Sequence, residues 1–144
     1  MISLDPETLK KVAARIDEKA AEFRETGRRL QEAFEPKRSD TVSSQLRNLQ
    51  QAAAAAQALY DVEYFVKNQI GRGKGDAKRW RDPGEKVLKD LEELRKVAKE
   101  LAKGAAPSEE DQQLLEHELR LRLLRGWIKV VVGEYMYRRA LRAV

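Results

Sequence analysis

The chain has 144 residues, of which 42% are apolar and 37% charged, and its formal net charge is +5. This length fits one compact domain with one core, and the even mixture of apolar and charged residues excludes a disordered tail. The lack of cysteine excludes disulfides, thiolate nucleophiles and sulfur-ligated metals. Because no stretch approaches the roughly 20 apolar residues of a membrane span, we expect a soluble, cytoplasmic single domain over residues 1–144.

The first predicted element is one long helix that ends before Pro36. Asp5 followed by Pro6 is a helix start signal, and apolar residues then recur at helical spacing as far as Phe34. The polar residues 36–40 form the first predicted linker.

The second predicted helix covers residues 41–70 and contains five consecutive alanines at positions 52–56. Alanine favours helix and lets a neighbouring helix, or another chain, lie close, and we favour packing within the domain. At about 100° per residue, one side of this helix carries Arg47, Gln51, Ala54, Ala58, Phe65 and Arg72, with a cation at each end. A core stripe on the other side consists of Leu46, Leu49, Ala53, Ala56 and Tyr60.

Residues 67–81 gather cations around Gly71, Gly73 and Gly75, with Asp76 as the one opposing acid. The six cations are Lys67, Arg72, Lys74, Lys78, Arg79 and Arg81. A flexible cationic loop combines mobile charges with bare backbone amides, which suits a phosphate backbone. Trp80 can stack on an unpaired base or cover the core, and we favour the core. Nucleic acid is therefore the first partner to test.

Two further elements complete the predicted fold. Pro83 opens an amphipathic helix that ends at Gly104. Ser108 caps the next helix, whose acidic first turn, residues 109–111, suits the positive end of the helix dipole. Gly126 either ends this helix or lies within a longer one, since an internal glycine costs only about 1 kcal/mol. The sequence thus predicts an all-α compact bundle of four to five helices.

Basic residues also gather from position 120 to the end of the sequence, where the one acid is Glu134. The cations of this C-terminal zone are Arg120, Arg122, Arg125, Lys129, Arg138, Arg139 and Arg142. The charge distribution therefore indicates two basic zones, the glycine-rich loop and the C-terminal helix.

The residues offer little to an enzyme. His117 is the one histidine, and between Glu116 and Glu118 it is expected to face solvent. The acids at 109–111 point in different directions around a helix, which does not suit Mg²⁺. The glycine-rich loop lacks the strand and the spacing of a phosphate-binding P-loop. We expect no enzymatic activity, no cofactor and no metal.

Two short stretches resemble a known family. Residues 43–48 read Ser-Ser-Gln-Leu-Arg-Asn, and residues 64–72 read Tyr-Phe-Val-Lys-Asn-Gln-Ile-Gly-Arg. They are similar to the Thr-x-Gln-Leu-Arg and Pro-Lys-x-x-x-x-x-Gly-Arg patterns of the small helical subunit of type III-A CRISPR effector complexes. The matching positions are Gln45, Leu46, Arg47, Lys67, Gly71 and Arg72. Residues 127–135 also resemble the apolar closing helix of that family, while Ser43, Val66 and Lys129 depart from its patterns.

The resemblance implies a non-catalytic subunit that lines the inner groove of a ribonucleoprotein, beside guide RNA and its paired target RNA. It also implies contacts with backbone and large subunits and with copies of the same chain in a filament. It assigns RNA contacts to Arg47, Lys67 and Arg72, and a structural or RNA-contacting role to Gln45. Charge clustering alone adds Lys74, Lys78, Arg79 and Arg81. Such contacts reach the RNA backbone, because base pairing with the guide supplies specificity.

Two alternatives remain open. One is a helical protein–protein adaptor without a nucleic-acid role, whose basic C-terminal helix binds an acidic partner or offsets the acidic first helix. The other is a peripheral membrane binder, which we do not favour because Trp127, Tyr135 and Tyr137 suit a core or a subunit seam better than a lipid face.

Overall fold

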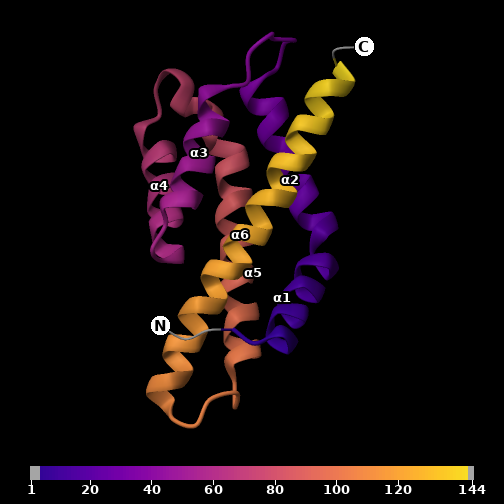
Figure 1. Cartoon of the computed structure of the whole chain (residues 1–144). Helices are drawn as coiled ribbons and strands as arrows, with labels where there is room; N and C mark the ends of the chain where they lie inside the picture. The colour runs from indigo at the N-terminus through magenta and orange to yellow at the C-terminus, as the bar shows by residue number, and fades with distance from the viewer. Residues whose placement is uncertain (1–3, 143–144) are drawn as a thin grey trace.

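The structure, a computed structural model, describes residues 4–142, apart from the side chains at positions 76 and 77. Within that range it contains helices and no strand (Figure 1), which confirms the all-α class, with six α-helices in place of the four to five expected. The α-helices are α1 Pro6–Glu18, α2 Ala20–Phe34, α3 Ser44–Ala55, α4 Leu59–Arg72, α5 Arg81–Ala102 and α6 Glu109–Arg142. A short 3-10 helix, η1, covers Gly75–Trp80.

The first predicted helix is two helices that meet at Lys19. The start signal is confirmed, since Asp5 Oδ1 accepts a hydrogen bond of 2.7 Å from the amide of Thr8. Lys19 has φ −97° and ψ 2°, so the chain bends there. The bend lets both halves follow α6 (Figure 1), and it buries Val12 from α1 and Phe23 from α2.

The predicted helix over residues 41–70 is wrong, because the chain turns back at Ala56, which has φ −62° and ψ 129°. Helices α3 and α4 instead pack side by side as an antiparallel pair. The turn buries Leu49 and Val62 in the same core, and this gain outweighs the helix propensity of the alanines. Asp61 Oδ2 accepts hydrogen bonds from two backbone amides at the start of α4. Tyr60, expected in the core, is 59% exposed.

Helix α6 runs unbroken through Gly126 and extends along the whole bundle (Figure 1). A Cβ at Gly126 would lie 3.0 Å from the Ile16 side chain, so the small residue admits α1. The predicted cap is confirmed, since Ser108 Oγ accepts from the Asp111 amide at 3.1 Å. Trp127 of α6 is fully buried, as expected, and packs into a core that α6 shares with the other α-helices.

A buried polar cluster joins α2, α5 and α6. Lys86 Nζ lies 2.5 Å from Asp90 Oδ1 and donates to the Glu22 carbonyl oxygen at 3.1 Å. The other oxygen of the Asp90 carboxylate accepts from the Thr26 hydroxyl and, at 3.0 Å, from the Trp127 indole N–H. These side chains satisfy one another inside the core, which fixes the relative positions of the three helices.

Candidate nucleic-acid interface

Three chain segments come together at one end of the bundle, the upper end in Figure 1. They are the connection between α2 and α3, the end of α4 with η1, and the end of α6. Helix α4 stops at Gly73, whose φ is 60°, and Gly75 follows with φ 56°. Both glycines adopt the left-handed conformation that turns the chain sharply into η1. We call this surface the cationic end, and its members are Lys37, Arg38, Arg47, Arg72, Lys74, Lys78, Arg79 and Arg81.

Trp80 anchors η1 to the core. It is fully buried, and its ring lies 4.9 Å from that of Phe34 and 5.7 Å from that of Phe65, measured between centroids. Its indole N–H donates to Gln45 Oε1 at 2.8 Å. Trp80 therefore has the core role that we favoured, and Gln45 has a structural role through this hydrogen bond. The anchor also fixes the positions of the cations on either side of it in the chain.

Arg79 connects η1 to the end of α2. Its Nη1 donates to the Phe34 carbonyl oxygen at 3.1 Å, where the helix leaves carbonyls without internal partners. The side chain is nevertheless exposed, and it lines the hollows on both sides of η1. Arg79 thus combines a structural contact with a position at the surface.

The first hollow lies between the α2–α3 connection and the start of α3, and its volume is about 610 Å³. The cations that line it are Lys37, Arg38, Arg47 and Arg79. Its acid is Glu35, which is buried and whose carboxylate accepts from the Tyr135 hydroxyl and from Arg139 Nε. Because Glu35 is already paired, positive charge dominates the accessible wall. Serine and threonine hydroxyls at positions 39–44 add donors for an anion.

The second hollow lies between α2 and the start of α5, and its volume is about 890 Å³. Its cations are Arg28, Arg29, Lys78, Arg79 and Arg81, and its acids are Glu32, Asp82 and Glu85. Arg28 is paired with Glu25 and Glu32, and its hydrogen bond lowers the pKa of Glu25 to about 2. Lys78 and Arg81 are exposed and form no ion pair with any described side chain. These two cations are the ones that the fold leaves available.

The structure brings several of the sequence-predicted residues together. Arg47 shares the first hollow with Arg79, which shares the second with Lys78 and Arg81. Arg72 and Lys74 are exposed at the end of α4 and in the turn that follows. Lys67 is exposed on the side of α4, short of the cationic end. The side chain of Asp76 lies outside the described residues.

The expected geometry of Arg47 and Arg72 is corrected by the turn at Ala56. They do not share one face of a long helix, because α3 and α4 are separate and antiparallel. Arg47 lies near the start of α3 and Arg72 at the end of α4, so the pair brings both to the same end of the bundle (Figure 1). Arg47 also donates to the Val42 carbonyl oxygen at 3.1 Å.

Sequence reasoning missed Lys37 and Arg38, which line the first hollow. They were assigned only to a polar linker, although two adjacent cations in a short loop next to a helix start were a usable signal. Their contribution depends on the fold, because the loop must return against α3 before these side chains join Arg47 and Arg79.

Much of the C-terminal basic zone holds the fold together. Arg139 Nη2 donates to the Ser39 carbonyl oxygen, and Arg142 Nη2 donates to that of Pro36, each at 2.6 Å. Farther back, Arg138 pairs with Glu134 at 2.7 Å. The end of α6 is therefore attached to the α2–α3 connection by its arginines. Tyr137, expected in a core or seam, is 59% exposed.

The described residues contain no group of three or more histidine, cysteine or acidic side chains arranged to hold a metal. His117 is half-buried on α6, rather than fully facing solvent as expected. None of the described helices is both long and apolar enough to cross a membrane.

No family model, curated protein or solved structure matches this chain. The class that the fold and the site define is an all-α bundle with a cationic end, whose cations come from the stretch between α2 and α3, from α3, and from the stretch between the end of α4 and the start of α5.

Proposed function

We propose that this chain is a non-catalytic RNA-binding subunit that holds a sugar-phosphate backbone at its cationic end. One observation carries this proposal: separate segments of the chain place exposed cations around two adjoining hollows. Guanidinium and ammonium groups neutralise phosphates and release counterions, which is the main source of affinity for nucleic-acid backbones. Contacts to phosphates carry no sequence information, so binding of this kind is independent of sequence.

The resemblance to the small subunit of type III-A CRISPR complexes favours RNA over DNA. Under this proposal, guide RNA and its target RNA are the ligands, and base pairing between them supplies specificity. The backbone and large subunits of the complex, and further copies of this chain, are the protein partners in the cytoplasm. The cationic end supports this proposal because its contacts suit any RNA sequence that the guide brings.

The test compares two charge-reversal variants in fluorescence anisotropy with a labelled single-stranded RNA. The site variant is Lys78→Glu with Arg81→Glu, and the matched control is Lys10→Glu with Lys99→Glu, on exposed positions of α1 and α5. Both variants change the net charge equally. We expect the site variant to weaken binding at least about tenfold and to reduce the slope of log affinity against log salt by about 1.4, the value for two lost phosphate contacts on a single strand.

Circular dichroism and the melting temperature should be unchanged in both variants, since all four side chains are exposed. Equal weakening by the site and control variants would contradict the assignment of the cationic end, because net charge alone would then explain the binding. A native chain that fails to bind RNA even at low salt would overturn the RNA-binding proposal itself.

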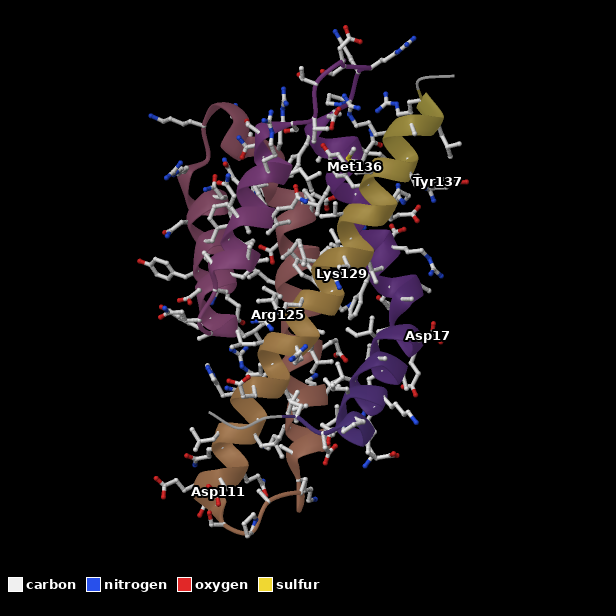
Figure 2. All side chains as sticks on the ribbon, viewed as in Figure 1. Asp17, Asp111, Arg125, Lys129, Met136 and Tyr137 are labelled. Carbon is white, nitrogen blue, oxygen red and sulfur yellow. The ribbon has the colours of Figure 1, made fainter. Side chains whose placement is uncertain are left out.

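The adaptor function is the second candidate, and a groove between α3 and α6 favours it. This groove of about 710 Å³ is lined by Gln50, Ala53, Ala54, Arg125, Ile128, Lys129, Val132 and Gly133. Figure 2 shows Arg125 and Lys129 on the exposed side of α6. Small and apolar residues beside two cations suit an acidic helix of a partner protein. The adaptor function gains support if the native chain does not bind RNA at any salt concentration.

A further inference from the structure

Two tyrosines on α4 are left at the surface, although the core was available to aromatic rings from the same helix. Tyr60 is 59% exposed and Tyr64 is 54% exposed, whereas Phe65 packs against Trp80. The two tyrosine rings lie side by side, 5.7 Å apart between centroids, with 34° between their planes. A tilted pair of this kind leaves ring faces and edges in contact with water.

The tyrosines begin a stripe that leads toward the cationic end. At about 100° per residue, Tyr60, Tyr64, Lys67 and Gly71 fall within about 60° of one another on α4. All four are exposed, and Arg72 continues the chain at the end of the helix. We call Tyr60, Tyr64 and Lys67 the tyrosine stripe. It joins aromatic rings to a cation along one accessible helix face.

Gly71 leaves the helix backbone beside the tyrosine stripe accessible to a ligand. It lies inside α4, where glycine is less favourable than alanine, and a Cβ built there would meet nothing within 4 Å. Packing inside this chain therefore does not require glycine at this position. A bare helix surface between aromatic rings and cations lets a ligand approach the backbone closely.

The acids next to the stripe are already engaged. Asp61 accepts hydrogen bonds from the backbone amides of Gln57 and Ala58. Glu63 is paired with Arg95 of α5, which lies 2.6 Å away and holds the pKa of the Glu63 carboxyl below its usual range. Lys67 is exposed and forms no ion pair with a described side chain, although its charge also contributes to the lowered pKa of Glu63.

We propose that the tyrosine stripe binds unpaired bases of single-stranded RNA, which stack on Tyr60 and Tyr64 while Lys67 contacts a neighbouring phosphate. Tyr64 and Lys67 are about 5 Å apart along the helix axis, so one nucleotide can touch both. Aromatic rings accept any base face, so this site adds affinity without sequence preference. Bases in a duplex are already stacked on one another and cannot use it. The proposal rests on the proposed RNA-binding function and adds to it a second contact, which only unpaired bases can make.

The test replaces both rings in the full-length chain, Tyr60→Ala with Tyr64→Ala. The matched control is Tyr137→Ala, because Tyr137 is also 59% exposed but projects from α6 on the side away from α3 and α4 (Figure 2). The probes are one labelled single-stranded RNA and the same RNA annealed to its complement. A second variant, Tyr60→Phe with Tyr64→Phe, keeps the rings and removes only the hydroxyls.

We expect the double alanine variant to lose at least about fivefold in affinity for the single strand, which is the lower limit for a single lost stacking contact. Its affinity for the duplex and its salt slope should stay native, because Lys67 and the cationic end are intact. The phenylalanine variant and the Tyr137→Ala control should bind both probes as the native chain does.

Several outcomes would overturn this inference alone. Salt-sensitive native binding with no loss in the double alanine variant would do so, as would equal losses for single strand and duplex. If the alanine variant fails to fold, Tyr60→Leu with Tyr64→Leu replaces it, and native affinity in that variant would also overturn the inference. Absence of RNA binding by the native chain would instead remove the proposed function on which the stripe depends.

Discussion

At the scale of single residues, the buried ammonium group of Lys86 depends on the Asp90 carboxylate. The Lys86 side chain is 6% exposed and that of Asp90 is 3% exposed. Burial raises the pKa of Asp90, and the hydrogen bonds from Lys86, Thr26 and Trp127 act in the opposite direction. Such a pair is costly to bury but more costly to break, since the remaining charge has no water around it.

We expect Lys86→Met to lower the free energy of unfolding by about 3 to 5 kcal/mol at neutral pH. Urea denaturation measures the loss, and Lys89→Met on an exposed position of the same helix is the control. Burial raises the pKa of the Asp90 carboxyl, so the folded variant binds a proton at Asp90 more tightly than the unfolded chain does. The loss in free energy of unfolding, relative to the native chain, should therefore become smaller as the pH falls. A loss of unfolding free energy no larger than that of Lys89→Met would contradict a stabilising role for the Lys86–Asp90 pair.

The sequence allowed some residue roles to be predicted and concealed others. Ser108 is identifiable as a cap because capping is a local interaction, and the core role is favoured for Trp80 because it lies where the next helix is predicted to begin. Lys86 resembled any surface lysine, since its burial depends on Asp90 and on α2 packing from elsewhere in the chain. Tyr60 was misplaced because helical spacing was continued through a turn.

At the scale of helices, Gly27 lets α2 approach α6 closely. A Cβ at Gly27 would lie 2.5 Å from the Val131 carbonyl oxygen and 3.0 Å from Cβ of Glu134. One of these atoms belongs to the backbone, so the contact cannot be relieved by a side-chain rotation. Gly133, on α6, is the opposite case, because a Cβ there would meet nothing within 4 Å.

We therefore expect opposite effects from two identical substitutions. Gly27→Ala should reduce the free energy of unfolding by about 2 kcal/mol or more, because the two helices must move apart. Gly133→Ala should raise it by about 1 kcal/mol, because alanine favours helix and meets no obstacle. Urea denaturation of both variants checks the pair, and a loss of stability in Gly133→Ala would show that its surroundings are less open than described.

Helix boundaries were predictable where local signals exist and wrong where tertiary packing decides. The start at Pro6 follows from capping and proline geometry, whereas α5 begins at Arg81, two residues before the predicted start at Pro83, and has no side-chain cap. The turn at Ala56 interrupts a run of strong helix formers, and only the burial of apolar residues from both α3 and α4 explains it. The reason for a glycine within α6 at position 126 is the close approach of Ile16 from α1, which the local sequence does not reveal.

At the scale of the whole molecule, ion pairs within and between helices give the stability a defined pH dependence. Arg28 lowers the pKa of Glu25 to about 2, while Arg95 and Lys19 lower the pKa values of Glu63 and Glu93. A carboxyl whose pKa is lower in the folded state stabilises the fold at pH values above its unfolded pKa, and the stabilisation disappears as the pH falls.

The melting temperature should accordingly fall between pH 4.5 and about pH 2, the unfolded and folded pKa values of Glu25. The rise in the pKa of Asp90 acts in the opposite direction and offsets part of this loss. In Glu25→Gln the decrease should be smaller, because one of the titrating groups is absent. Thermal unfolding followed by circular dichroism over this range tests the expectation, and an identical decrease in Glu25→Gln would contradict it.

The candidate site was predictable in part at this scale. Clustering of charge within residues 67–81 indicated a cationic surface, since neighbouring residues in a loop remain close in any fold. The contribution of Lys37 and Arg38 depends on the path of the α2–α3 connection. Arg139 and Arg142 are the opposite case. Their charge suggests a binding surface, but in the fold they hold the α2–α3 connection through hydrogen bonds.

The position of α6 in the chain order affects how the protein is made. Its contacts include the bond between Tyr135 and Glu35, which are 100 residues apart, so α2 leaves the ribosome long before its partner helix is synthesised. Phe23 and Leu30, fully covered in the finished bundle, face water or a chaperone during that interval. Translation of α6 therefore sets the moment at which the nascent chain can close its core, which is late for a helical bundle.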